Sequence, residues 1–269
     1  MIGGSLGLDL RAAGYGVLGV SRQQATCDRA LARGVADSAS LELASLAGAD
    51  VIILCTPLHV LGQTVVQLRP HLRPETVLTD VGSVKGPIVA EIAPLWPNFV
   101  GGHPMAGTAD QGIEAALSNL FQGRPYVLTP TAQTPELAVE RVWAIALALG
   151  ALPHRCTPEE HDRAVAWISH LPVMVSTSLF QACRQEPSPE VRRLAQQLAS
   201  SGFRDTSRVG GGNPELGQLM ARYNREALLT SLGAYRRSLD QLIAQIEGED
   251  WPGIAQTLAQ GQGDRPLFL

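Results

Sequence analysis

The chain has 269 residues, 45% of them hydrophobic and 17% charged, which is typical of a folded protein with enough apolar residues for two modest cores. Its net charge of −4 at pH 7 gives no general attraction to phosphate backbones, so nucleic acid is not an expected partner. Apolar runs fall short of the roughly 18 residues that span a bilayer, and the start does not resemble a signal peptide. We therefore expect a cytoplasmic protein without a membrane partner.

The four cysteines, Cys27, Cys55, Cys156 and Cys183, lie far apart in the sequence. They form no C-x-x-C pair, which argues against a structural zinc site and against the disulfide framework of a small secreted domain. We expect reduced, packed thiols and no metal site.

Glycines cluster at the start of the chain, in the segment Met-Ile-Gly-Gly-Ser-Leu-Gly, ahead of a helical stretch to Ala13. In a G-x-G-x-x-G turn the first two glycines let the backbone approach a pyrophosphate, and the third lets helix and strand pack closely. Only the third, Gly3, is present. We expect Gly3 to lie at a cofactor site and the first strand of the nucleotide-binding unit to be missing. Glycines of an ordinary N-terminal loop are the alternative.

Short β-branched runs alternate with helical stretches from Ile2 to about Cys156, which predicts an α/β, Rossmann-like, doubly wound and mostly parallel sheet. The strand candidates are residues 17–21, 51–55, 77–81, 99–102 and 126–128. A further extended segment, 152–155, is expected at a sheet edge because Pro153 has no N–H to donate.

Polar residues follow two of these strands where a nucleotide is expected to bind. A dinucleotide fold reads the ribose at the end of its second strand, where Asp or Glu favours NAD. Ser21 and Arg22 instead offer a hydroxyl and a guanidinium to a 2′-phosphate, so we predict NADP. Thr56 and Pro57 follow the strand 51–55 and are expected beside the same cofactor. The alternatives are a solvated arginine and a proline that merely starts the next helix.

Strand signals stop after Cys156, and Thr157 and Pro158 begin a helical pattern with two acidic residues in its first turn. We expect a nucleotide-binding domain at 1–156 and an all-helical domain at 157–269, for substrate binding and dimerisation. An apolar stripe recurs at three- and four-residue spacing near the end of the chain. Its residues are Leu228, Leu229, Leu232, Tyr235, Leu239, Leu242, Ile243 and Ile246. Core packing is the first interpretation, and a homodimer seam is the alternative.

Four motifs identify a family: Asp-Val-Gly-Ser-Val-Lys at 80–85, Gly-Gly-His-Pro-Met-Ala-Gly at 101–107, Ile-Ser-His-Leu-Pro at 168–172 and Gly-Phe-Arg-Asp-Thr-Ser-Arg at 202–208. Together, and in this order, they resemble the prephenate/arogenate dehydrogenases, most of all the cyanobacterial type. The resemblance covers the chain except for the missing first strand.

The resemblance implies oxidative decarboxylation of arogenate to tyrosine with NADP as hydride acceptor. Prephenate, giving 4-hydroxyphenylpyruvate, is the alternative substrate, because the residues do not decide between an amino and a keto group. A different hypothesis is an inactive fragment that cannot bind cofactor without its first strand. A β-hydroxyacid-type dehydrogenase would need a catalytic lysine where this chain has Ser-His-Leu-Pro.

His103 is the expected general base, since it follows a strand end between Gly102 and Pro104 and an imidazole can accept a hydroxyl proton near neutral pH. A lone histidine in a loop is otherwise more often structural. The family pattern implies that Ser83 orients the base or binds the substrate hydroxyl, and a helix N-cap is its alternative role. For Lys85 no role is assigned, because a first-turn lysine often points to solvent.

The resemblance makes His170 a substrate-binding side chain, although a hydrogen-bonded core histidine is the alternative. Arg208 is the best match for an arginine that grips a substrate carboxylate, and Arg204 competes for that role. An exposed ion pair with Asp205 or Glu215 is the plain alternative for either arginine.

Overall fold

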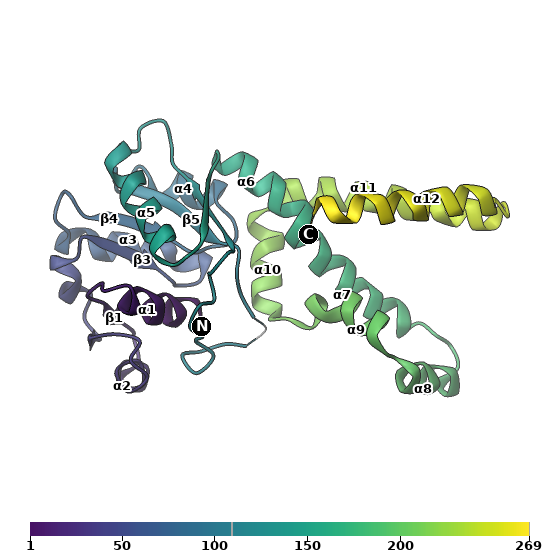
Figure 1. The fold of residues 1–269 in the computed structure, drawn as a ribbon, viewed down its shortest axis with the longest axis horizontal. Coiled ribbons are helices and arrows are strands. Elements are labelled where there is room, and N and C mark those ends of the chain that lie inside the picture. The colour runs from purple at the N-terminus through teal and green to yellow at the C-terminus, as the bar shows by residue number, and fades with distance from the viewer. Residues whose placement is uncertain (109, 269) are drawn as a thin grey trace.

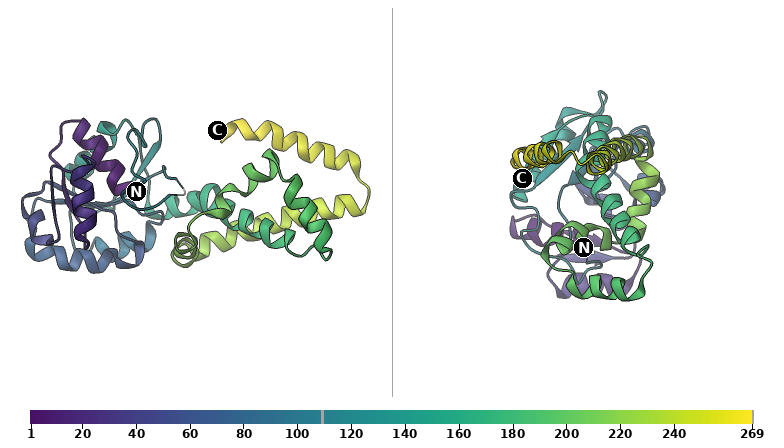
Figure 2. Two further views of the ribbon diagram at one scale, coloured as in Figure 1. Left: turned by 90° about the horizontal axis from the view of Figure 1, so that it is seen from below. Right: turned by 90° about the vertical axis from the view of Figure 1, so that its right-hand side faces the viewer.

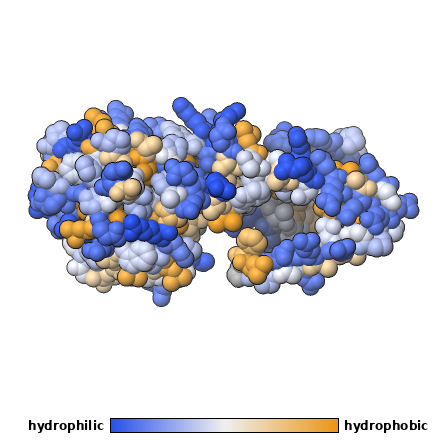
Figure 3. Space-filling model, turned by 90° about the horizontal axis from the view of Figure 1, so that it is seen from above, coloured by the Kyte–Doolittle hydropathy of each residue, from blue (hydrophilic) through white to orange (hydrophobic). Residues whose placement is uncertain are grey.

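The computed structural model describes residues 1–108 and 110–268, which form two lobes (Figure 1). One lobe is a sheet flanked by helices, and the other is helical. Figure 3 shows a narrower waist between the lobes and a hollow in the face of the helical lobe. The predicted change from strands to helices near Cys156 is confirmed.

The strands form two sheets. The smaller pairs β1 (Leu18–Val20) in parallel with β2 (Ser38–Ser40). The larger has the order β3-β4-β5-β6-β7 and is parallel except between β5 and β6. Its strands are β3 (Val51–Leu54), β4 (Val77–Asp80), β5 (Phe99–Pro104), β6 (Pro125–Thr129) and β7 (Leu152–Arg155).

All the strands predicted from the sequence are present, with shifted ends, and β7 lies at the predicted edge. The β2 strand was not predicted, because its sequence, Ser-Ala-Ser, has no apolar alternation. The prediction that His103 lies in a loop after its strand is wrong. Pairing with β6 continues the β5 ladder through His103, which is opposite Val127.

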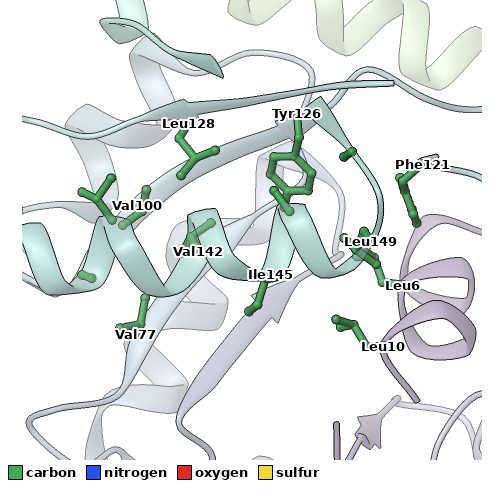
Figure 4. Packing of buried hydrophobic residues seen from close by; sticks show 14 residues of the cluster. Leu6, Leu10, Val77, Val100, Phe121, Tyr126, Leu128, Val142, Ile145 and Leu149 are labelled. Atoms are coloured by element: carbon green, nitrogen blue, oxygen red, sulfur yellow. The ribbon is translucent and has the colours of Figure 1, made fainter. Parts of the chain in front are cut away.

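Helices cover both faces of the larger sheet. Leu6 and Leu10 of α1 (Ile2–Ala12) pack with Val142 and Ile145 of α5 (Glu136–Ala148) in one buried cluster (Figure 4). A second cluster joins the opposite face to α3 (Leu61–Leu68) and α4 (Gly86–Ile92). The α2 helix (Gln24–Ala32) flanks the smaller sheet. Burying continuous apolar strands on both faces is what a doubly wound sheet requires.

A cavity of about 1860 Å³ separates the smaller sheet from the larger one. It is lined by β1 and β3, whose facing edges do not pair in the described structure, and by the start of α1. The cavity extends to the carboxyl ends of both strands at Ser21 and Cys55.

The helical lobe begins with Thr157 as N-cap, as the sequence predicts, and the structure adds a full capping box. The Thr157 hydroxyl accepts from the Glu160 N–H, and the Glu160 carboxylate accepts from the Thr157 N–H. A π-helical turn, Ala166–His170, then leads into a helix that carries Pro172 in its first turn. The helices are α6 (Pro158–Val165), α7 (Leu171–Cys183), α8 (Pro189–Leu198), α9 (Ser201–Ser207), α10 (Pro214–Tyr223), α11 (Arg225–Glu247) and α12 (Trp251–Asp264).

Most of the apolar stripe on α11 is exposed, so the expectation of core packing is wrong for much of its length. Leu228 is buried, but Tyr235 is 40% exposed, Leu239 45% and Ile243 44%. The physical reason is geometric: α11 runs away from the α/β lobe, and α12 lies on the other side of the helical lobe (Figure 2). Among the described residues, no helix is long and apolar enough to cross a membrane.

Candidate functional site

A buried ion pair fixes the strand ends that carry the candidate base. Lys85 and Asp80 are both fully buried and bond to each other through Nζ and Oδ2. Lys85 Nζ also donates to the Gly102 carbonyl at 2.8 Å, and Asp80 Oδ1 accepts from the Gly102 N–H at 3.0 Å. The pair therefore holds both backbone groups of the residue before His103, and Lys85 does not point to solvent.

Gly102 allows this close approach of β5 to β4. A Cβ at this position would lie 2.6 Å from the Asp80 carbonyl oxygen and 2.7 Å from the Thr79 hydroxyl oxygen, closer than real side chains come. The glycine before His103 is thus required by packing.

His103 meets a histidine from the helical lobe. Its Nδ1 lies 2.8 Å from His161 Nε2, and His161 Nδ1 lies 2.8 Å from Asp162 Oδ1. Asp162 also accepts from the backbone N–H groups of Lys85 and Gly86, each at 2.7 Å. These bonds join α6 to the start of α4.

His170 is fully buried beside this cluster and bonds to Asn224. The Asn224 amide nitrogen donates to the Asp162 carbonyl at 2.7 Å and lies 3.1 Å from His170 Nδ1. Because a carbonyl needs a donor, the amide nitrogen is fixed, and its second hydrogen donates to His170 Nδ1. His170 Nε2 then carries the ring proton, and within the described residues this buried nitrogen has no partner.

The Ser83 hydroxyl is a second buried polar atom without a partner among the described residues. It does not cap a helix, because α4 begins at Gly86 with Lys85 at the N-cap position and no side-chain cap bond. The N-cap alternative for Ser83 is therefore wrong. An unpaired buried hydroxyl costs roughly 1–3 kcal/mol, so a ligand that bonds to Ser83 and His170 would recover that cost.

Burial favours the neutral form of the His103 and His170 rings. It lowers the pKa of His103 well below 6.5, with further lowering from His161, Lys85 and His170. Burial likewise lowers the pKa of His170 to about 4, although Asp162 opposes the shift. Both rings are therefore neutral at pH 7, which suits a base at His103 and a hydrogen-bond donor at His170.

The five candidate cofactor residues line one cavity: Gly3, Ser21, Arg22, Thr56 and Pro57. A Cβ on Gly3 would lie 3.1 Å from Cys55, so α1 packs tightly on the end of β3, as expected for the third glycine of a nucleotide turn. The Ser21 hydroxyl accepts from the Gln23 N–H at 3.3 Å, and Arg22 is exposed. Pro57 also precedes a 3₁₀ turn, Leu58–Val60, so the alternative that this proline starts the next helical segment holds as well.

The two arginine candidates both lie in the helical lobe, at the end of α9 and the start of the turn that follows it. Arg204 of α9 is exposed and pairs with Asp205 at 3.2 Å. Arg208 is exposed too and begins the 3₁₀ turn Arg208–Gly211, which is held to α7 by a bond from the Gly210 N–H to Ser176.

Sequence reasoning missed His161, Asp162 and Asn224. The only signal for the first two was their place just after the Thr157 capping box, at the domain junction, where helix α6 meets the sheet. Asn224 lies between two helices, 62 residues from its partner Asp162, and no local pattern predicts that contact. Within residues 1–108 and 110–268, no group of three or more His, Cys, Asp or Glu is placed to hold a metal ion.

Two family models cover this architecture. The nucleotide-binding domain of prephenate dehydrogenase matches residues 6–152, and the dimerization domain of prephenate dehydrogenase matches residues 157–260. The chain belongs to the prephenate dehydrogenase family. Prephenate dehydrogenase of Bacillus subtilis is 31% identical over 93% of this chain and 69% of its own length. Cyclohexadienyl dehydrogenase of Zymomonas mobilis is 29% identical over 88% of this chain and 82% of its own length.

Solved structures agree with this assignment. Arogenate dehydrogenase of Synechocystis is 52% identical, with a TM-score of 0.88 over 100% of this chain and 96% of that one. Prephenate dehydrogenase of Aquifex aeolicus, in complex with hydroxyphenyl propionate and NAD+, is 27% identical, with a TM-score of 0.93 over 100% of this chain and 95% of that one. The chain is thus similar to a prephenate/arogenate dehydrogenase of tyrosine biosynthesis with a nicotinamide cofactor, and the fold predicted from the sequence is confirmed.

Proposed function

We propose that this chain oxidatively decarboxylates arogenate to tyrosine with NADP as hydride acceptor. The observation that carries the proposal is the buried, neutral His103 at a strand end, together with the buried polar atoms of Ser83 and His170 that have no partner among the described residues. A base and two hydrogen-bonding groups at the carboxyl edge of a nucleotide-binding sheet suit oxidation of a secondary alcohol.

The reaction separates three fragments from the substrate: a hydride from the ring carbon that bears the hydroxyl, the hydroxyl proton and CO₂. A bound nicotinamide would take the hydride. His103 accepts the proton at its free ring nitrogen, and the carboxylate leaves as CO₂ because its loss makes the ring aromatic. The protonated His103 then returns the proton to the phenolate oxygen, which gives tyrosine. Ser83 and His170 orient the substrate, and Arg208 grips a carboxylate, with Arg204 as the competing candidate.

The choice of NADP rests on the end of β1. Ser21 and Arg22 supply a hydroxyl and a guanidinium where an acidic residue would repel a 2′-phosphate. Gly3, Thr56 and Pro57 line the same cavity and complete the proposed cofactor site.

Arogenate is preferred to prephenate because the Synechocystis protein, 52% identical over the whole of this chain, is an arogenate dehydrogenase. Prephenate is the second candidate, since the B. subtilis and A. aeolicus proteins are prephenate dehydrogenases.

We further propose that two copies pair through residues 157–269, separated from the nucleotide-binding domain between 156 and 157. Every described residue of α12 is at least partly exposed, and exposed apolar side chains continue along α8, α11 and α12. A single chain leaves this apolar surface in water, and a symmetric partner would bury it. A cytoplasmic location remains a prediction from the sequence.

The rival hypothesis of a chain that cannot hold cofactor is favoured by one observation, the separation of β1 from β3 by the cavity. Binding of NADP to the purified chain, followed by fluorescence or calorimetry, decides between the two hypotheses.

Replacing His103 with Asn tests the proposed chemistry. Loss of a general base lowers kcat by roughly 10²–10⁴-fold, with substrate affinity kept by the remaining contacts. A control change of the exposed His154 to Asn leaves kcat unaltered. If the His103→Asn variant turned over within a few-fold of the unaltered chain, the base assignment would be wrong.

A further inference from the structure

Two buried histidines from different lobes face each other edge-on. His103 lies on β5 and His161 on α6, and their ring centroids are 5.1 Å apart at an interplanar angle of 70°. His103 is 8% exposed and His161 2% exposed. The contact at 2.8 Å between His103 Nδ1 and His161 Nε2 requires one nitrogen to donate and the other to accept.

Asp162 decides the direction of that bond. A carboxylate only accepts, and Asp162 already accepts from two backbone N–H groups, at Lys85 and Gly86. His161 Nδ1, 2.8 Å from Asp162 Oδ1, must therefore be the donor. In a neutral His161 ring the other nitrogen, Nε2, is then an acceptor, so His103 donates from Nδ1.

We propose that His161, oriented by Asp162, is a positioning residue that keeps the ring proton of His103 on Nδ1 and leaves Nε2 as the basic nitrogen. This inference rests on the proposed function, because it assumes that His103 is the base. In the reaction the substrate O–H bond breaks and a new N–H bond forms at His103 Nε2. His161 continues to accept from Nδ1, so no proton passes along the chain of residues.

The tautomer of the base thus depends on how the lobes dock. His161 and Asp162 both belong to α6 of the helical lobe, and Asp162 is held by the two amides that begin α4 of the α/β lobe. Separation of α6 from α4 would free both nitrogens of the base. Docking therefore assembles the site and also selects the reactive form of His103.

Nitrogen-15 NMR of histidine-labelled protein tests the inference without turnover. In the unaltered chain His103 carries its proton on Nδ1. In His161→Phe, which keeps an aromatic ring but removes the acceptor, His103 becomes a mixture of tautomers, and in His161→Gln, which restores an acceptor oxygen, the Nδ1–H form recovers. A proton on Nε2 of His103 in the unaltered chain, or an unchanged tautomer in His161→Phe, would overturn the proposal.

Steady-state kinetics of the same variants separate positioning from a structural role. We expect His161→Phe to lower kcat by about 10²-fold at nearly constant KM, and His161→Gln to recover most of that loss. Equal losses in both variants would mean that His161 only supports the fold. If the unaltered chain oxidises neither arogenate nor prephenate but the tautomers behave as described, the positioning role stands and the proposed function fails.

Discussion

The two lobes differ in how completely one chain can bury them. The α/β lobe contains both buried clusters, and its sheet is covered on each face. Beyond residue 157 the buried apolar side chains among the described residues are Pro158, Val165, Ala166, Leu219, Met220 and Leu228, and Leu219 packs against the α/β lobe. The α/β lobe is thus stabilised by its own core, whereas the helical lobe of a single chain leaves much of its apolar surface exposed to water.

A matched pair of truncations tests this difference most strongly. Leu78→Ala in the fully buried centre of β4 should destabilise the chain by about 2–5 kcal/mol, because it leaves a cavity in a packed core. Ile243→Ala, at a 44% exposed position on α11, should cost a monomer far less. Chemical denaturation measures both losses.

The same Ile243 site has a second readout. If two copies pair through the stripe, Ile243→Asp shifts the chain from dimer to monomer in light scattering, because it places a charge in an apolar seam. A chain that is monomeric before any substitution would contradict the pairing. A matched Gln241→Asp change on the same helix, outside the stripe, serves as the control.

The preference for NADP over NAD tests the proposed cofactor site, which lies entirely in the α/β lobe. Ser21→Asp combined with Arg22→Ala removes the charge-assisted contacts to a 2′-phosphate and should shift the ratio of kcat/KM for NADP over NAD by about 10–100-fold towards NAD. An unchanged preference for NADP over NAD would contradict the assignment of β1 as the strand whose end binds the ribose. Arg124→Ala, at an exposed position outside the lining of the cofactor cavity, is the control for loss of one positive charge.

The affinity for substrate tests the proposed role of the helical lobe in binding the substrate carboxylate. Arg208→Ala should raise the KM for substrate by about 10–100-fold, the loss of a bidentate bond to a carboxylate, with kcat less affected. Arg204→Ala is the comparison, because Arg204 already pairs with Asp205. A larger effect at Arg204 than at Arg208 would exchange their roles.

The pH profile gives the smallest expected effect. Burial lowers the pKa of His103 below 6.5, so the base stays unprotonated as pH falls from 7 through 6.5. We therefore expect kcat/KM to remain level in that range and to decline only at lower pH, as His103 gains a proton. An acid limb at or above pH 6.5 would contradict the buried environment of the ring.

The sequence predicts what local patterns determine. Apolar runs located β3, β4, β5 and β6 of the larger sheet, and the N-cap signal at Thr157 located the start of the helical lobe. The sequence did not predict the bonds from the Lys85 and Gly86 N–H groups to Asp162, because they join residues 77 and 76 positions apart. The sequence also could not predict that the α11 stripe is exposed, because periodicity predicts an apolar helix face but not which surface packs against it.

The most direct test of the central claim is reduction of cofactor at 340 nm by the purified chain, with arogenate and with prephenate, each against NADP and NAD. We expect the highest kcat/KM for arogenate with NADP. Faster oxidation of prephenate, or preference for NAD, would contradict the proposed specificity, and binding of NADP without oxidation of either substrate would contradict the enzyme claim itself.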